Sequence, residues 1–414
     1  MKFIILQDVP YRRPEGALAQ YHGAIWAEEL RRRGHEATKM VVGDPKVFVP
    51  ESSILSLSTN SQRIDPSFWT DIKADCVLYY ANPSIDCVRV VKAIKKGSPT
   101  TLVISRIEAF WAPNPWSLRR ARASFVRRYI EARHCPTERF DFEKRSVSAA
   151  LARTFAGTIR SLLDSTLKNI VSIVETSDRT TFFFPRLVEE ARDFFRLMGR
   201  TDLARKIEWC GYPVRSQFQP PPHGKKESGS VISIANWRHV KDPELTADAM
   251  VIALRKNRQA SYLVVGERSD RVADRIRTTA PDIASRIKAF EHVDNRELPG
   301  LLAKSQVFLL CSFKEGISSV LSEALCCGCS LALATGPAVG VFQDYLTSGI
   351  GTQSSSRSAA DMARATLVEL EAWRNGMRNA LSISQKWDCT HVSSLCSTLF
   401  GRDKTESEGS GLQQ

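Results

Sequence analysis

The stretch VFLLCSFKEGISSVLSEALCCGCSLALA, residues 307–334, contains the pattern that decides the fold. It opens with the unbroken apolar run 307–311, which is typical of a strand that is buried on both faces of a parallel sheet. A turn at Gly316 follows, and residues 320–327 then form a short helix. A second apolar strand covers 330–334. The stretch therefore predicts a β-loop-α-β unit of a doubly wound α/β domain.

The same alternation of strands and helices continues through the rest of the chain. In the C-terminal half we expect strands at 231–235, 262–266 and 287–290 and helices at 242–256, 271–280 and 297–303. In the N-terminal half we expect strands at 2–6, 37–42, 76–80 and 101–105 and helices at 20–33, 85–95, 147–163 and 187–198. The sequence therefore predicts two doubly wound α/β domains in series, with a cleft between them.

A change in composition separates the two predicted domains. Residues 207–222 include Gly211 and Pro213 and lead into the run PPPHGKK, which is typical of a linker. We therefore expect an N-terminal domain over 1–215 and a C-terminal domain over 216–387. The tail 401–414 is polar and rich in Ser, Gly and Glu, so we expect it to be disordered.

The overall composition is that of a soluble globular protein. Of the 414 residues, 43% are apolar and 25% are charged, and no apolar run approaches the roughly 20 residues of a membrane span. The opening residues lack a secretory pattern, and the ten cysteines are scattered without paired spacing, so we expect a cytoplasmic location. The net charge of +13 indicates an acidic partner: nucleic acid, an anionic bilayer or a phosphorylated small molecule.

One dense cysteine group, Cys326, Cys327 and Cys329, raises the question of a metal site. A structural zinc ion requires four ligands, and no second group of Cys or His with ligand spacing accompanies these three. We therefore expect a packing role and no metal.

The chemistry of residues 313–325 points to a phosphorylated ligand. Neither a Walker phosphate loop nor a G-x-G-x-x-G motif follows the first strand of either domain, so phosphate must be held differently. Gly316 allows a tight turn, after which the amides of 317–320 (Ile317, Ser318, Ser319 and Val320) lie at a helix N-terminus that favours anions. Glu323 then lies one to two turns into the helix, in reach of ribose hydroxyls, and Glu315 precedes the turn, in reach of sugar hydroxyls. The alternative is that Glu315 is a solvated loop residue and Glu323 a surface carboxylate.

Residues 309–334 resemble the signature of the glycosyltransferase group 1 family, also called family 4 glycosyltransferases, which have the GT-B fold. The shared features are the apolar strand, the Glu315-Gly316 pair, the glutamate at 323 and the following strand of small residues. One departure is Ile317-Ser318-Ser319, where the family usually has an aromatic or apolar residue and a proline. The resemblance implies two facing Rossmann-like domains, a nucleotide-sugar donor on the C-terminal one and an acceptor on the N-terminal one. It also implies retention of configuration, no metal or other cofactor, and a last helix at about 388–400 that packs back onto the N-terminal domain.

Two further segments resemble the family's donor site. Arg238 and Lys241 resemble the cations that neutralise the donor diphosphate, although the interval between them is shorter than usual. The alternative is a pair of surface cations on a loop. Residues 287–298 resemble the strand and loop that hold the nucleotide base, with His292 in place of the usual glycine, followed by Val293. His292 either stacks on a base or is exposed, and exposure is slightly favoured.

The N-terminal half resembles the family's first loop and helix. Gly16 and His22 occupy the loop that ordinarily approaches the donor phosphate and the acceptor, while Ala17 and Leu18 stand where the family has a glycine pair. After the strand 101–105, many members have a histidine near the reacting sugar, and this chain has Arg106-Ile107-Glu108. Arg106, Glu108 and Glu315 are therefore the candidates for catalytic residues.

A basic segment stands apart from these motifs. Residues 117–133 contain six arginines and one glutamate and follow Trp111 and Trp116. If the segment is helical, the arginines from Arg119 to Arg133 flank an apolar face that suits an anionic membrane surface, and the acceptor would then be lipid-linked. A helix that packs on the sheet of its own domain would show a similar pattern.

The sequence thus predicts a glycosyltransferase that moves a sugar from a nucleoside-diphosphate sugar to a glycan or lipid-linked acceptor, as in polysaccharide biosynthesis. One alternative is a nucleotide-sugar 2-epimerase or hydrolase on the same fold. Another is a basic binding protein that has lost catalysis, which the missing glycine pair and histidine would explain. We expect no nucleic-acid partner, because the sequence has no RNA-binding signature and no interleaved aromatic platform.

Overall fold

The computed structural model describes residues 1–10, 18–43, 54–81, 84–107, 166–183, 185–312, 319–335, 346, 349–387 and 390–400. These residues fall into two compact units. The described part of the N-terminal unit lies within 1–107, 166–215 and 390–400, and that of the C-terminal unit within 216–387.

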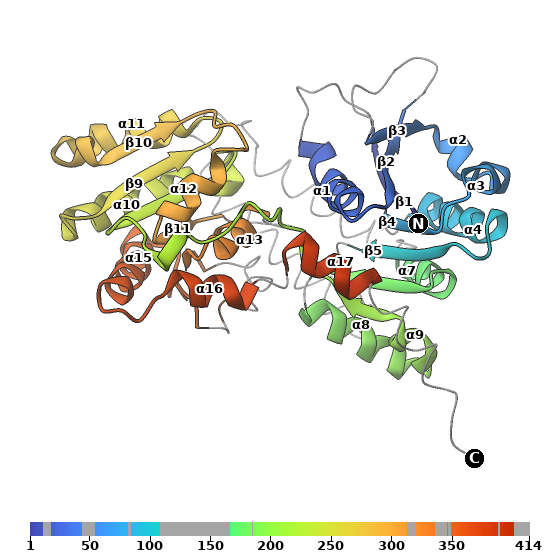
Figure 1. The fold of residues 1–414 in the computed structure, drawn as a ribbon. Helices are drawn as coiled ribbons and strands as arrows, with labels where there is room; N and C mark the ends of the chain where they lie inside the picture. Colours follow the sequence, from blue (N-terminus) through green and yellow to red (C-terminus); the bar gives the residue numbers. More distant parts are fainter. Residues whose placement is uncertain are drawn as a thin grey trace, which may run out of the picture. The chain divides into compact units, whose positions relative to one another are not determined.

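A parallel sheet of seven strands forms the centre of the N-terminal unit (Figure 1). Its strands are β1 (Lys2–Pro10), β2 (Glu36–Val42), β3 (Leu55–Ser58), β4 (Cys76–Ala81), β5 (Leu102–Ile107), β6 (Arg179–Phe182) and β7 (Ile207–Trp209). They are arranged in the order β3-β2-β1-β4-β5-β6-β7, and every pair is parallel. The chain therefore extends the sheet first on one side of β1 and then on the other, so the order reverses between β1 and β4.

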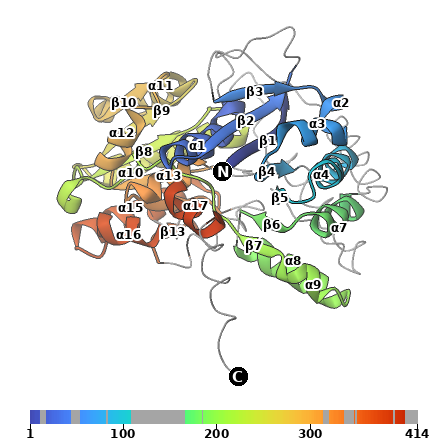
Figure 2. The same ribbon diagram turned by 45° about the vertical axis from the view of Figure 1, so that its right-hand side comes forward.

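Helices cover both faces of this sheet (Figure 2). They are α1 (Leu18–Arg32), α2 (Asn60–Arg63), α3 (Pro66–Ile72), α4 (Ile85–Gly97), α7 (Thr166–Thr176), α8 (Pro185–Leu197), α9 (Thr201–Arg205) and α17 (Val392–Phe400). One apolar core unites residues of α3, α4, α7 and α8 with the inward side chains of the strands. Local signals set the helix starts: the Asp65 side chain accepts a hydrogen bond from the amide of Ser67 ahead of α3, and the Ser84 hydroxyl does the same for Cys87 at the start of α4.

The C-terminal helix α17 packs on α1 in the N-terminal unit. The guanidinium of Arg33, just after α1, donates to the carbonyl of Ser393 and to the hydroxyl of Ser397. The rings of Phe3 and Phe400 meet edge to face at 5.0 Å between centroids. The N-terminal unit is therefore completed by a segment from the far end of the chain.

The C-terminal unit contains a second parallel sheet, of six strands. They are β8 (Ser230–Ile234), β9 (Ser261–Val265), β10 (Ile287–Phe290), β11 (Val307–Leu310), β12 (Ser330–Leu333) and β13 (Gly351–Gln353). Their order is β10-β9-β8-β11-β12-β13, so the direction of growth reverses between β8 and β11. All pairs are parallel.

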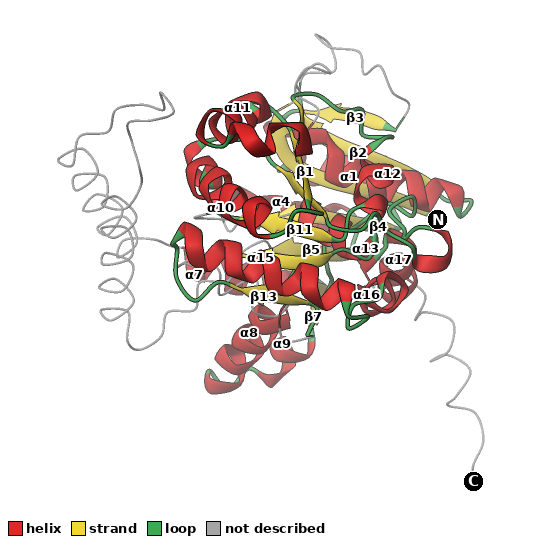
Figure 3. Cartoon of the chain, turned by 90° about the vertical axis from the view of Figure 1, so that its left-hand side faces the viewer, coloured by secondary structure: helices red, strands yellow, loops and turns green. Residues whose placement is uncertain are grey.

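The helices of the C-terminal unit form two layers. They are α10 (Pro243–Lys256), α11 (Ser269–Thr279), α12 (Leu298–Lys304), α13 (Ser319–Cys326), α15 (Ala359–Arg374) and α16 (Ala380–Trp387), with the 3-10 turns η2 (Pro222–Gly224), η3 (His239–Lys241) and η4 (Pro281–Arg286). Helices α11, α10 and α15 lie side by side over one face, where they share an apolar core with the strands (Figure 3). Helix α13 contacts α12 and α16 instead.

The predicted alternation of strands and helices is confirmed in both units, with element ends that differ by a few residues. The prediction of a linker from residue 207 is wrong for its first residues, because 207–209 form β7 at the edge of the first sheet. Leu18, which was predicted to lie in a loop, is the first residue of α1. Strands β3 and β6 were not predicted, since each has only four residues and gives too short a pattern to indicate a strand. The predicted helix at 147–163 and the tail 401–414 lie outside the described residues.

Candidate donor-binding site

The residues predicted to bind the donor follow strands that are neighbours in the second sheet. Arg238 and Lys241 come after β8, and Ser319, Val320 and Glu323 belong to α13, which comes after β11. Strands β8 and β11 are hydrogen-bonded neighbours on either side of the point where the strand order reverses. In doubly wound sheets ligands bind at the carboxyl ends of the strands at such a point. The topology thus brings the two strongest sequence motifs to the same edge of the sheet.

The loop that carries Arg238 is anchored to the end of β9. The indole of Trp237 is buried and its Nε1 donates to the carbonyl of Val265 over 3.0 Å, while its backbone amide donates to the carbonyl of Glu267 over 3.1 Å. Gly266 has a φ of +111°, and a Cβ there would lie 2.1 Å from the carbonyl oxygen of Ala235. Only glycine allows the two backbones to come this close. The glycine and the hydrogen bonds of Trp237 therefore keep the loops after β8 and β9 in contact. Arg238 follows the anchored tryptophan with an exposed side chain.

The start of α10 is fixed on the same edge. Asp242 adopts a left-handed conformation with a φ of 50°, and its Oδ1 accepts a hydrogen bond from the amide of Leu245. Its Oδ2 pairs with the guanidinium of Arg357. Lys241, which immediately precedes Asp242, is half-buried, in contrast to the exposed Arg238.

Arg357 connects three loops at this edge, although its residue type and position gave no signal in the sequence. Besides Asp242, it donates to the carbonyls of Cys311 over 2.7 Å, Ser312 over 3.2 Å and Thr335 over 3.1 Å. Cys311 and Ser312 directly follow β11, and Thr335 follows β12. One side chain thus ties the loop after β8, which carries Arg238 and Lys241, to the end of the strand that leads toward α13. Burial raises the pKa of the Cys311 thiol to about 12, so this thiol adds no charge beside the ion pair.

Glu323 lies in the first turns of α13 and is buried, with 5% of its surface exposed. The alternative that it is a surface carboxylate is therefore wrong. A carboxylate is costly to bury unless it is partnered, so its place inside the unit is a specific feature of this helix. Ser319 and Val320 begin the same helix and are half-buried. The remaining residues of this motif, Glu315, Gly316, Ile317 and Ser318, lie outside the described residues.

The other predicted donor residues lie farther along the sheet. His292 and Val293 follow β10, the edge strand, with β9 between it and β8. His292 is exposed and Val293 is half-buried. The exposed side chain of His292 is able to contact a ligand. However, His292 follows β10 and does not lie beside β8 and β11, the two strands that the other predicted donor residues follow.

The cysteine group next to the site packs in the interior. Cys326, Cys327 and Cys329 are buried, and the thiol of Cys329 donates to the carbonyl of Leu302 over 3.1 Å. Lys226 donates to the carbonyls of Ala303 and Cys327, so it caps the C-terminal ends of α12 and α13 together. Within the described residues, no group of three or more His, Cys, Asp or Glu side chains is placed to hold a metal ion.

The N-terminal candidates are placed less favourably. Arg106, on β5, has no exposed surface. Its guanidinium donates to the Sγ of Cys210 over 2.8 Å and to the carbonyl of Gly211 over 2.5 Å. Three aromatic rings surround the guanidinium. Its Cζ lies 3.8 Å from the ring centroid of Phe183, 5.5 Å from that of Tyr80 and 5.8 Å from that of Trp26. The prediction that Arg106 is catalytic does not agree with this placement, because a fully enclosed side chain offers no surface to a substrate.

The remaining N-terminal predictions fall on residues whose geometry is not described. His22 lies in α1, but its side chain is not described, and Gly16, Glu108 and the basic segment 117–133 lie outside the described residues. No helix that the structure describes is both long and apolar enough to span a bilayer.

A family model matches part of this chain. Residues 215–379 match the model of the family described as "Glycosyl transferases group 1", a segment that covers most of the C-terminal unit. The predicted resemblance is therefore confirmed, and with it the class of enzyme, a glycosyltransferase. A search of curated protein sequences finds no match.

Solved structures resemble the whole chain in fold. Anabaena HepE in complex with UDP has 12% sequence identity and a TM-score of 0.57, with 96% of this chain and 98% of that chain covered. A glycosyltransferase from Rickettsia africae has 12% identity and a TM-score of 0.53, with 96% of each chain covered. The lipopolysaccharide outer core galactosyltransferase WaaB has 13% identity and a TM-score of 0.53, with 97% of this chain and 99% of that chain covered. At these identities the likeness shows the fold, and the predicted GT-B class of two Rossmann-like units is confirmed.

Proposed function

We propose that this protein transfers a sugar from a nucleoside-diphosphate sugar, bound by the C-terminal unit, to an acceptor bound by the N-terminal unit. The observation that carries the proposal is the convergence of two motifs at one edge of the second sheet. Arg238 and Lys241 follow β8, and α13 with the buried Glu323 follows the neighbouring strand β11. Cations and a helix N-terminus at one edge suit a diphosphate, and a carboxylate within the helix suits ribose hydroxyls.

Features of the similar proteins support a nucleotide donor. Anabaena HepE, which shares the fold, forms a complex with UDP. We further propose, from the family resemblance, that transfer retains the anomeric configuration and needs no metal, and that Glu315, Gly316, Ile317 and Ser318 complete the donor site. Glu108 and Glu315 stay proposed catalytic residues, and Gly16 and His22 stay proposed acceptor-side residues.

Thermal stabilisation of the full chain by UDP-, GDP- and ADP-sugars tests the donor site. A ligand at about a hundred times its dissociation constant adds about 2.7 kcal/mol to the free energy of unfolding. We expect one nucleotide class to stabilise the wild type and Arg238→Ala and Lys241→Ala to lose most of that shift. Arg255→Ala is a matched control, since Arg255 is an exposed arginine in the last turn of α10, at the opposite edge of the sheet.

The outcomes separate the competing functions. Nucleotide affinity that is unchanged in both variants would contradict the site. Consumption of the donor without any acceptor would indicate the epimerase or hydrolase alternative. If no nucleotide sugar binds at all, the chain is better explained as a basic binding protein that has lost catalysis.

We also propose that the acceptor is presented at an anionic membrane surface on the cytoplasmic side. The support is the sequence of 117–133, with its six arginines near Trp111 and Trp116. Each cation near such a surface contributes about 1 kcal/mol. Reversing three of them, in Arg119→Glu, Arg122→Glu and Arg127→Glu combined, should abolish co-sedimentation with anionic vesicles while nucleotide binding is kept. If the wild-type protein does not co-sediment with anionic vesicles, this part of the proposal is refuted.

A further inference from the structure

Asp8 lies at the carboxyl end of β1, at the point where the order of the N-terminal sheet reverses. Strands β2 and β3 extend the sheet on one side of β1, and β4 to β7 extend it on the other. This is the place in a doubly wound sheet where ligands bind. None of the sequence motifs described above includes Asp8.

Three donors from different elements hold the carboxylate of Asp8. Its Oδ1 accepts a hydrogen bond from the guanidinium of Arg63, at the end of α2, over 3.0 Å. Its Oδ2 accepts from the hydroxyl of Tyr79 on β4 over 2.5 Å and from the thiol of Cys87 in the first turn of α4 over 3.0 Å. The contacts therefore join β1 and β4, the two strands that flank the reversal.

The environment keeps all three partners as donors. Burial raises the pKa of Tyr79, and it raises the pKa of Cys87 to about 11, so both side chains keep their protons at neutral pH. Arg63 is buried, and it also donates to the Ser58 hydroxyl over 2.6 Å and the carbonyl of Gln7 over 2.9 Å. Its second terminal nitrogen is buried and has no hydrogen-bond partner among the residues that the structure describes. A buried guanidinium with an unsatisfied donor lowers the stability of the fold. This cost indicates that Arg63 is placed there to hold the carboxylate of Asp8.

Asp8 itself is open to a ligand. Its side chain is 24% exposed, whereas that of Arg63 is 1% exposed. A carboxylate offers about four acceptor positions. The described residues supply three donors, two of them on Oδ2, which leaves an acceptor position on Oδ1 with respect to this part of the chain.

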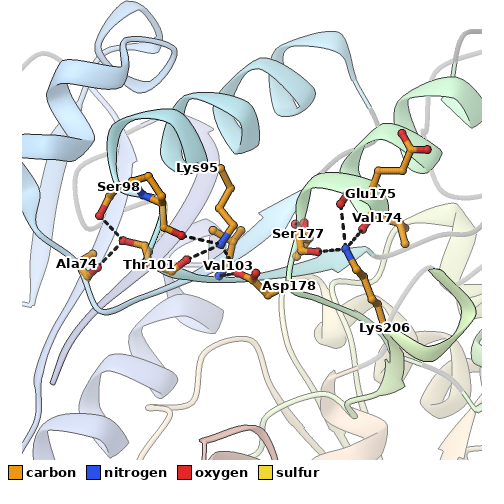
Figure 4. A network of polar contacts seen from close by, with 12 residues as sticks. Ala74, Lys95, Ser98, Thr101, Val103, Val174, Glu175, Ser177, Asp178 and Lys206 are labelled. Carbon is orange, nitrogen blue, oxygen red and sulfur yellow. Dashed lines mark hydrogen bonds and ion pairs between the residues drawn. The ribbon is translucent and has the colours of Figure 1, made fainter. Parts of the chain in front are cut away.

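Asp178, at the other edge of the same sheet, is a carboxylate whose hydrogen bonds have a structural role only (Figure 4). Asp178 precedes β6, and its Oδ2 accepts from the Nζ of Lys95 over 2.7 Å and from the amide of Val103 over 2.7 Å. Lys95 also donates to the carbonyl of Thr101 over 2.9 Å. These contacts tie the C-terminal end of α4 to the starts of β5 and β6, at the amino edge, where doubly wound sheets do not bind ligands. Asp178 is therefore a matched control for Asp8.

We propose that Asp8 is an acceptor-binding residue, whose carboxylate accepts a hydrogen bond from a hydroxyl group of a neutral sugar or polyol. Arg63, Tyr79 and Cys87 are positioning residues, because they fix the orientation of the carboxylate and do not themselves touch the acceptor. A carboxylate repels phosphate and carboxylate groups, so the part of the acceptor beside Asp8 is uncharged. The inference rests on the proposed function, since it assigns the acceptor side of the same reaction.

Binding of methyl glucoside, methyl galactoside and methyl mannoside to the full chain, followed by saturation-transfer NMR, tests the assignment. We expect at least one glycoside to bind the wild type and Asp8→Asn to weaken that binding by about tenfold to a hundredfold, the range for a lost hydrogen bond to a charged group. Tyr79→Phe should weaken it by a smaller factor, because the ring still fills its place while the carboxylate loses one fixed contact. Asp178→Asn should leave the affinity unchanged. Stabilisation by UDP should be the same in all three variants.

Several outcomes would overturn the assignment: no glycoside binds the wild type, Asp8→Asn binds as the wild type does, or Asp178→Asn weakens binding equally. If Asp8→Asn does not fold because Arg63 is left with a buried charge, the combined Asp8→Asn and Arg63→Met variant removes that charge and takes its place in the comparison. Failure of the proposed function would be a different result: the wild type would not bind any nucleotide. The glycoside affinities of the wild type and the variants could still be compared in that case.

Discussion

Replacing Arg357 with leucine tests whether one side chain holds the candidate donor site together. The guanidinium of Arg357 pairs with Asp242 and donates to the carbonyls of Cys311, Ser312 and Thr335. Leucine fills part of the same space but donates no hydrogen bond. The variant therefore leaves one carboxylate oxygen and three carbonyl oxygens without this donor.

The cost follows from how far these groups are buried. Breaking a fully buried ion pair by removing one partner costs about 3 to 5 kcal/mol. The side chains of Arg357 and Asp242 are 19% and 13% exposed, so water is able to solvate Asp242 in part. We therefore expect the free energy of unfolding of the C-terminal unit to fall by about 3 kcal/mol, near the lower end of that range. Because the loop with Arg238 and Lys241 loses its tie to β11, nucleotide affinity should fall as well.

The assay is urea unfolding together with a nucleotide titration under conditions where each variant is folded. Arg378→Leu is the matched control, because Arg378 is also 19% exposed and makes a bidentate pair with the buried Glu369 in the same unit. We expect both variants to lose stability and only Arg357→Leu to lose nucleotide affinity, by about tenfold. Equal nucleotide affinity in Arg357→Leu and wild type would refute the view that this side chain organises the site, and so would an equal loss in Arg378→Leu.

Three further predictions concern buried polar side chains. Glu323→Gln keeps the shape of α13 but removes the charge, and steady-state kinetics should show a loss of donor affinity or turnover of at least about tenfold. Burial lowers the pKa of Lys39 to about 7 from its usual 10.5, so the unfolded chain binds more protons between these values and stability should rise with pH from 7 to 10.5; urea unfolding of Lys39→Met should lack this rise. Arg106→Ala should lower the free energy of unfolding by about 3 kcal/mol, because it empties an enclosed space, whereas lost turnover at unchanged stability would favour a catalytic role instead.

Much of the architecture could be predicted because strand and helix patterns are local. The apolar runs around Val307 and Ser330, with the helix between them, gave a β-loop-α-β unit that the structure contains as β11, α13 and β12. Strands β3 and β6 were not predicted, and β7 was predicted to be part of a linker. Each is too short to show a clear strand pattern, and hydrogen bonding to a longer neighbouring strand holds it in the sheet.

The candidate site was predictable in part for a similar reason. Arg238, Lys241 and Glu323 follow strands, and loops after strands are where ligands bind in this class of fold. The burial of Glu323 could not be predicted, because a glutamate in a short helix reads equally well as a surface residue. Arg106 follows the predicted strand 101–105, and only the packing of three aromatic rings around it shows that its side chain is enclosed.

The sequence by itself determined the order of strands and helices, the positions of the loop motifs and the family resemblance, since all of these depend on residues close together in the chain. The tertiary structure decided which loops become neighbours, because that depends on the order of strands in each sheet. Arg357 and Asp242 are 115 residues apart in sequence, and Asp8 meets Cys87 across 79 residues. No local pattern encodes such pairs, because their side chains come within hydrogen-bonding distance only after the parallel strands have assembled around β8 and β11 and around β1 and β4.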